Sequence, residues 1–115
     1  MPPLLYEEPD LPDAREAFLD WFREHRPDVL ICHDGKAREV LEDAGIRIPD
    51  DVGLVHLNLG LDTPGWTGMH LDDARIGEAC VDLLVSQIQQ NQRGVPEFPY
   101  EMLLRPEWRK GETTR

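Results

Sequence analysis

The segment from Arg26 to Leu59 constrains the fold more than any other part of the chain. It reads RPDVLICHDGKAREVLEDAGIRIPDDVGLVHLNL: an apolar run, a polar turn, a helical pattern that ends at a glycine, and a second apolar run. This order and length are typical of a βαβ unit, in which a helix joins two parallel strands. We therefore predict an α/β fold with a parallel sheet and flanking helices, whose βαβ unit with its preceding helix occupies residues 13–59.

Both apolar runs predict buried strands. Val29 to Cys32 is bounded by Pro-Asp before it and by a polar turn after it, which suits a strand covered on both faces. Val52 to Leu57 is the second buried strand of the prediction. Gly45 stands where a left-handed residue would end the intervening helix.

Polar side chains follow each strand and predict a binding crevice. His33 and Asp34 come directly after the first strand, and Asn58 follows the second. In parallel α/β sheets, ligands bind outside the carboxyl ends of the strands, so these three residues should face one crevice. His33 is interpreted as a ligand contact, a pH-sensitive group or a helix cap, and Asp34 as an acceptor of backbone N–H groups in preference to a ligand contact. Asn58 is the best polar candidate for contact with a small molecule.

Trp66 lies in a glycine- and proline-containing loop after the second strand. Two interpretations stay open, because a tryptophan in such a loop either closes over a ligand as a flat wall or fills the core.

Further elements are expected on both sides of the βαβ unit. Asp13 begins a helix that should stop before Pro27, and Leu4 to Tyr6 is a candidate edge strand. Residues 67–92 should hold a crossover strand and the longest helix. Residues 100–105 alternate between apolar and polar, which predicts a final strand, and the tail after them should be loose apart from its tryptophan.

The longest helix should carry an apolar stripe that needs a partner. Residues 73–91 place apolar side chains at helical spacing, and we expect them to fold back onto the sheet or to pack against a second copy of the chain. The stripe consists of Ile76, Ala79, Cys80, Leu83, Leu84 and Ile88.

Charge and motif content exclude several classes of function. The chain has 115 residues and a net charge of −11, so its surface repels nucleic-acid phosphates and anionic lipids. Cys32 and Cys80 lack metal-ligand spacing, and no apolar run is long enough to span a membrane. No P-loop, GxGxxG or GxSxG motif is present, so the prediction is a non-enzyme without metal or cofactor, located in the cytoplasm.

The order of motifs resembles the effector-binding core of the lactose-repressor and galactose-repressor family of bacterial transcription regulators. The family has "RPDAIFCAND", "LGIRVPEDVSVVGFDD", a Thr-containing strand, "EIGRRAVELLL" and "LLPPELVVRES". The matching text here is RPDVLICHD, AGIRIPDDVGLVHLNL, TGMHLD, ARIGEACVDLLVSQI and FPYEMLLRPEW. The resemblance covers roughly residues 13–108.

The resemblance implies a partial type I periplasmic-binding-protein-like fold in which residues 1–115 form the C-terminal portion of an effector-binding and dimerisation domain. It implies a sugar-like small-molecule effector, a homodimer or larger assembly, and operator contact only through a DNA-binding headpiece that this chain does not contain. Asp34 matches the Asp of the family's Asn-Asp pair, while His33 replaces the Asn and Asn58 replaces the first Asp of "GFDD". These replacements put a sugar effector in doubt.

Two alternatives remain beside the regulator. A fragment of a periplasmic sugar-binding transport protein would share the fold, although the N-terminus has no export signal. A small enzyme of flavodoxin-like architecture would need a phosphate- or metal-binding loop, which the sequence lacks.

Overall fold

The chain forms a four-stranded sheet with helices, in a computed structural model that describes residues 12–60, 63–96, 98–99 and 101–115. The elements in chain order are α1 (Pro12–His25), β1 (Val29–Cys32), α2 (Lys36–Asp43), β2 (Gly53–Leu59), β3 (Thr67–His70), α3 (Asp73–Gln89) and β4 (Glu107–Arg109). The strand order is β1-β2-β3-β4. The first three strands are parallel and β4 runs antiparallel to β3, so the predicted α/β class and the βαβ unit are confirmed.

Local signals in the sequence set the helix boundaries. Asp72 caps α3 because its carboxylate accepts hydrogen bonds from the backbone N–H groups of Ala74 and Arg75, at 3.1 and 3.3 Å. Gly45 adopts a φ of +78° directly after the C-cap residue of α2, the left-handed conformation that glycine takes without strain. The position of Gly45 agrees with the sequence prediction.

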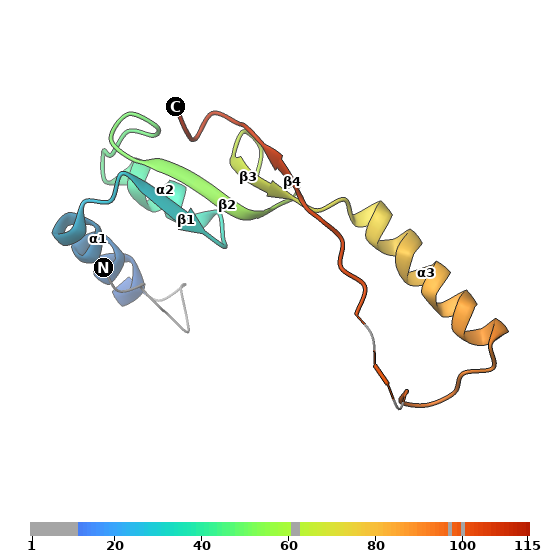
Figure 1. The fold of residues 1–115 in the computed structure, drawn as a ribbon. Helices are drawn as coiled ribbons and strands as arrows, with labels where there is room; N and C mark the ends of the chain where they lie inside the picture. Colours follow the sequence, from blue (N-terminus) through green and yellow to red (C-terminus); the bar gives the residue numbers. More distant parts are fainter. Residues whose placement is uncertain (1–11, 61–62, 97, 100) are drawn as a thin grey trace.

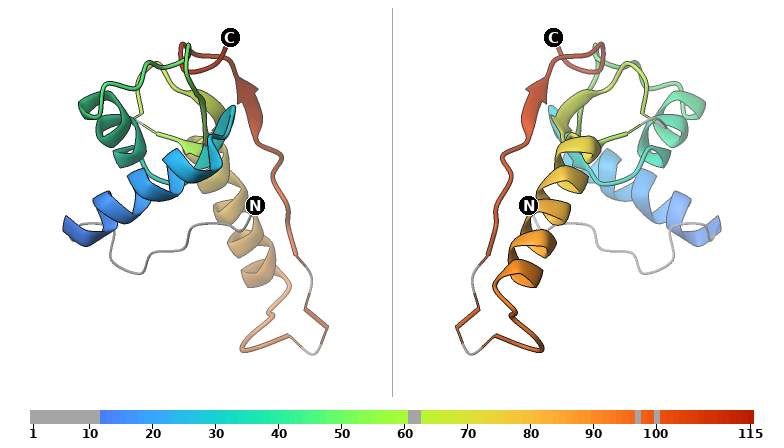
Figure 2. Two further views of the ribbon diagram at one scale, coloured as in Figure 1. Left: turned by 90° about the vertical axis from the view of Figure 1, so that its left-hand side faces the viewer. Right: turned by 90° about the vertical axis from the view of Figure 1, so that its right-hand side faces the viewer.

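Helices α1 and α2 cover one face of the sheet, and the core lies between these helices and the sheet (Figures 1 and 2). The buried cluster joins Leu41 of α2 to side chains of β1, β2 and the following loop. Its members are Leu30, Leu41, Val52, Leu54, Leu59 and Trp66.

The prediction that both faces of β1 are buried is wrong. Val29 and Ile31 are 51% and 69% exposed, whereas Leu30 between them is buried. Alternate residues of a strand point to opposite faces, so β1 has one face against the helices and one face in water. The sequence pattern of a two-sided strand is present, but the described chain covers only one side.

Helix α3 projects away from this body (Figure 1). It makes no extensive packing contact with another described helix or strand, and none of its residues is buried. The molecule measures 58 × 28 × 23 Å and has a radius of gyration of 19.3 Å. A compact chain of this length would have a radius of about 13 Å. The expected folding of the α3 stripe back onto its own sheet therefore does not occur.

The last strand lies later in the sequence than predicted. Residues 101–105 form no strand, and β4 begins only at Glu107, where Glu107 to Arg109 pair with β3. The alternating pattern that suggested a strand at 100–105 thus has no neighbouring strand to pair with. Position 100 and the candidate edge strand at 4–6 fall outside the described residues.

The C-terminal tail, expected to be loose, is fastened to the sheet. The Thr113 hydroxyl donates to the Leu54 carbonyl oxygen at 2.7 Å and accepts from the Thr67 N–H at 2.8 Å. The Leu54 N–H in turn donates to the Thr113 carbonyl oxygen at 2.7 Å. Thr113 is 1% exposed, and Trp108, the one tail residue expected to be held, is 56% exposed. Buried hydrogen bonds, which composition does not reveal, hold the tail.

We predict that Thr113→Val destabilises the protein by about 1 to 3 kcal/mol, because valine keeps the shape but leaves buried backbone groups of β2 and β3 without their partner. Urea unfolding followed by circular dichroism measures the change. Thr113→Ser, which keeps the hydroxyl, is the matched control and should lose clearly less stability. Equal losses in the two variants would show that the hydroxyl contributes little.

Candidate functional site

Polar residues lie near the carboxyl ends of β1 and β2, although Asn58, expected to follow the second strand, lies within β2. Cys32, the last residue of β1, is in register with His56 of β2. His33 follows Cys32 directly, and Asn58 lies two residues beyond His56. The side chains of His33, Asp34 and Asn58 are all exposed. The parallel register therefore brings these three residues to one edge, open to solvent.

Asp34 fixes the turn between β1 and α2. Its Oδ1 accepts a hydrogen bond from the backbone N–H of Lys36, the first residue of α2, at 2.9 Å. This bond satisfies one of the N–H groups that a helix start leaves unpaired. The structural interpretation of Asp34 is confirmed.

His56 belongs to this edge, although the sequence analysis did not select it. Its Nδ1 accepts a hydrogen bond from the backbone N–H of Asn58 at 3.2 Å. The imidazole therefore holds the backbone of Asn58, whose side chain is exposed. The side chain is 4% exposed, and its Nε2 has no hydrogen-bond partner within the described chain. The signal in the sequence was a histidine inside an otherwise apolar strand.

An irregularity in β2 sets how Asn58 is presented. The pairing of β2 with β3 changes register between His56 and Leu59, which leaves Leu57 and Asn58 both exposed before Leu59 returns to the core. Such a bulge re-aims side chains and recurs next to binding sites. Because a bulge depends on the neighbouring strand, the β2 sequence alone did not predict it.

Trp66 lies in the core and is 5% exposed. Its ring meets the His56 ring edge-on, with 5.3 Å between the ring centroids. Of the two interpretations left open, the structure has the one in which the tryptophan fills the core. Through His56, Trp66 supports the strand that carries Asn58.

The Cys32 thiol is a poor nucleophile in this setting. Burial, and then the charge of Asp34, raise the pKa of the thiol from 9.0 to about 11. The thiolate is the reactive form of cysteine, so a raised pKa keeps the group inert near neutral pH.

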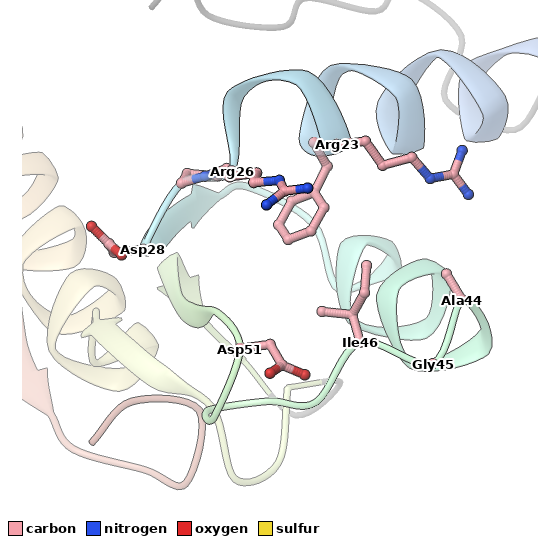
Figure 3. Close-up of a pocket in the computed structure, with 9 residues that line it drawn as sticks. Arg23, Arg26, Asp28, Ala44, Gly45, Ile46 and Asp51 are labelled. Carbon is pink, nitrogen blue, oxygen red and sulfur yellow. The ribbon is translucent and has the colours of Figure 1, made fainter.

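A separate open cavity of about 480 Å³ lies at the other end of the sheet (Figure 3). Its lining includes Arg26 and Asp28, which precede β1, and Asp51, which precedes β2. Arg26 and Asp51 lie on opposite sides of the space, while Arg23 and Asp28 point away from it. The cavity therefore opens at the amino ends of the strands and shares no residue with the polar edge.

Two of the four charged residues that line this cavity, Arg23 and Asp51, are paired with residues outside its lining. Arg47 Nη2 and Asp51 Oδ1 are 2.8 Å apart, and Arg47 Nε and its backbone N–H both donate to Asp51 Oδ2. Hydrogen bonds from Arg47 lower the pKa of Asp51 to about 2. Arg23 donates to Asp20 at 3.1 Å. Since Arg23 and Asp51 are already engaged, we regard the cavity as a weaker candidate than the carboxyl edge.

Two further properties hold for the described ranges of the chain. No group of three or more His, Cys, Asp or Glu side chains is arranged to hold a metal ion there. None of the helices described is long and apolar enough to cross a membrane.

We predict that Cys32 reacts slowly with iodoacetamide at pH 8, because a thiol with a pKa near 11 has only about one molecule in a thousand as thiolate. Mass spectrometry of the native and the denatured protein gives the two rates. Asp34→Asn should speed the native reaction by removing a nearby negative charge, while its amide oxygen can still accept the Lys36 N–H. Equal rates for Cys32 in native and denatured protein would contradict the prediction.

Comparison with solved structures shows that the fold is similar to the folds of two bacterial regulators. A LacI family transcriptional regulator from Arthrobacter sp. FB24 in complex with lactose matches with a TM-score of 0.70 and 24% sequence identity, over 88% of this chain and 40% of that one. A second structure of the same regulator matches with a TM-score of 0.71 and the same identity and coverage. A PurR family regulator from Vibrio parahaemolyticus RIMD 2210633 has a TM-score of 0.65 and 19% identity, over 88% and 38% of the two chains.

The chain thus spans about two fifths of the length of these structures. A search of curated proteins gave no match. The family model described as a periplasmic binding protein-like domain matches residues 4–114, which is nearly the whole chain. With its parallel sheet and its polar carboxyl edge, this chain belongs to the periplasmic-binding-protein-like domain family.

Proposed function

We propose that the chain is part of the effector-sensing domain of a bacterial transcription regulator of the LacI type, and that it binds a small molecule without acting as an enzyme. One observation carries the proposal: the parallel pairing of β1 and β2 brings His33, Asp34 and Asn58 to one exposed edge of the sheet. Ligands of open α/β sheets bind at this edge. The fold shared with LacI and PurR family regulators supports the regulator over other classes.

The chemistry of the edge suits a small polar ligand rich in hydroxyl groups. The amide of Asn58 offers donors and an acceptor, and the imidazole of His33 offers a donor nitrogen and an acceptor nitrogen. The free lone pairs of Asp34 accept hydrogen bonds. Trp66 and His56 form the support beneath Asn58, with Trp66 in the core. A similar regulator was solved with lactose, so lactose is a reasonable first probe.

This edge supplies one wall of a crevice. In a two-lobed domain, a ligand that binds one arrangement of the lobes more tightly shifts the population towards it. Such a shift would change the spacing of two DNA-binding headpieces in a homodimer located in the cytoplasm, which is allostery by differential affinity. The acidic chain itself would not contact the operator.

A sugar-binding component of a transporter would share the fold and is the alternative. The coding sequence upstream of this chain separates the two possibilities. A helix-turn-helix segment there supports the regulator, and an export signal supports the transporter.

We predict weak binding of lactose, with a Kd of about 1 mM or higher, because only one wall of the crevice is provided. Amide NMR shifts should concentrate on residues 33–35 and 58–60. His33→Ala and Asn58→Ala should each weaken binding, by up to about tenfold for the loss of one hydrogen bond.

The control for this titration is Arg26→Ala, which alters the separate cavity and should leave lactose affinity unchanged. Shifts confined to residues around Arg26, or unchanged affinity in both variants of the carboxyl edge, would contradict the proposed site.

We also predict that the chain alone shows no sequence-specific binding to duplex DNA, since its net charge of −11 opposes contact with phosphates. Fluorescence anisotropy at low salt, where electrostatic attraction is strongest, measures this. Saturable, sequence-dependent binding with a Kd below about 1 µM would overturn the assignment of DNA contact to a headpiece.

A further inference from the structure

One side-chain hydrogen bond holds the backbone of Asn58 at the carboxyl edge. His56 is paired with Cys32 of β1 on one side and with Gly68 of β3 on the other, whereas the described register pairs neither strand with Asn58. The N–H of Asn58 donates instead to Nδ1 of the His56 ring, at 3.2 Å. A side chain therefore takes the place of a neighbouring strand as the acceptor for this backbone group.

The surroundings of His56 fix where its ring lies. The alternation of β2 places the side chain on the same face as the buried Leu54, and His56 is itself buried. The Trp66 ring meets it edge-on, and a side chain at Gly68 would collide with the backbone carbonyl oxygen of His56. The described residues of this chain thus enclose His56 by themselves.

Only one protonation state of His56 suits its hydrogen bond. Nδ1 must be unprotonated to accept from the Asn58 N–H, so we assign the proton of the neutral ring to Nε2. Nε2 is buried and has no hydrogen-bond partner in the part of the chain that the structure describes. A second proton would turn Nδ1 into a donor that faces another donor, and it would place a charge in the core without an acceptor.

His70, two residues beyond Gly68 on β3, has the opposite arrangement. Its Nδ1 lies 3.4 Å from the carbonyl oxygen of Leu59, which can only accept, so Nδ1 of this ring carries the proton. Protonation of His70 keeps that donor, whereas protonation of His56 removes an acceptor. Acid therefore acts on the backbone of Asn58 through His56 and not through His70.

The other ionisable groups around this ring lie on β1, α2 and the C-terminal tail, and none of them is bonded to it in the described chain. The thiol of Cys32, in register with His56, stays neutral because burial and then the charge of Asp34 raise its pKa to about 11. Charged side chains of α2 are exposed, apart from Arg38, which is paired with Glu42. The exposed Glu112 of the tail lies beside Gly65, next to Trp66.

We propose that His56 is a positioning residue for the effector site, and that it holds Asn58 in place only while its ring is neutral. The inference rests on the proposed function for the role of Asn58, but the coupling between the two residues is measurable without a ligand. When the ring gains a proton, its bond to Asn58 breaks and the bulge loses the contact that fixes it. Acid should therefore weaken ligand binding, and neutral or alkaline pH should restore it.

The decisive experiment is an NMR titration of the ligand-free chain from pH 8 to pH 5, a range that brackets the ordinary histidine pKa of about 6.5. Ring nitrogen shifts at pH 8 should show the proton of His56 on Nε2 and that of His70 on Nδ1. On acidification, the Asn58 amide should change its shift and lose protection from hydrogen exchange with the same midpoint as the His56 ring. A proton on Nδ1 of His56 at pH 8, a His56 ring that stays neutral to pH 5, or an Asn58 amide that ignores its titration would each overturn the inference.

Two variants separate the acceptor from the ring. His56→Asn keeps an acceptor oxygen close to the position of Nδ1 and does not titrate, so the Asn58 amide should stay protected at both ends of the pH range. His56→Phe keeps a flat ring against Trp66 but has no acceptor, so protection should be lost throughout. His70→Asn is the matched control and should leave the pH response of Asn58 intact. A response that persists in His56→Asn would belong to another group and contradict the proposal.

Lactose titrations at pH 8 and pH 5 connect this coupling to binding. The Kd of the unmodified chain should rise by up to about tenfold at pH 5, the effect of one lost hydrogen bond, and the Kd of His56→Asn should change clearly less. His33 is present in both proteins, so its own titration cancels in the comparison. The same pH effect in both proteins would overturn the role of His56. Failure of lactose to bind at either pH would contradict the proposed function without altering the outcome of the ligand-free titration.

Discussion

A parallel sheet has two faces to remove from water, and in the described part of this chain helices cover only one of them. Helices α1 and α2 pack on the face that carries Leu30 and Leu54, and the core forms there. The opposite face keeps Val29 and Ile31 exposed, and α3 projects from the body with its apolar side chains unburied. Burial of a large apolar side chain stabilises a fold by about 1.5 to 3 kcal/mol, a contribution that these exposed side chains do not make here.

The parts of the fold that the sequence predicted are those set by local chemistry. The βαβ unit follows from two apolar runs and the end of α2 from Gly45, signals that act within a few residues. The predictions that were wrong concern residues whose structure depends on partners far away in the sequence. An alternating pattern at residues 100–105 predicted a strand, but β4 lies at Glu107–Arg109, where β3 is available for pairing. Thr113 is buried because Leu54 and Thr67 offer it partners.

The candidate site divides in the same way. The edge where His33, Asp34 and Asn58 meet was predictable, because parallel strands carry their carboxyl ends to the same side. The packing that supports Asn58 was not predictable, since it depends on the bulge in β2, where the register with β3 changes between His56 and Leu59. His56 becomes the brace of Asn58 only in this geometry, and Trp66 meets it from a loop whose path the sequence did not fix.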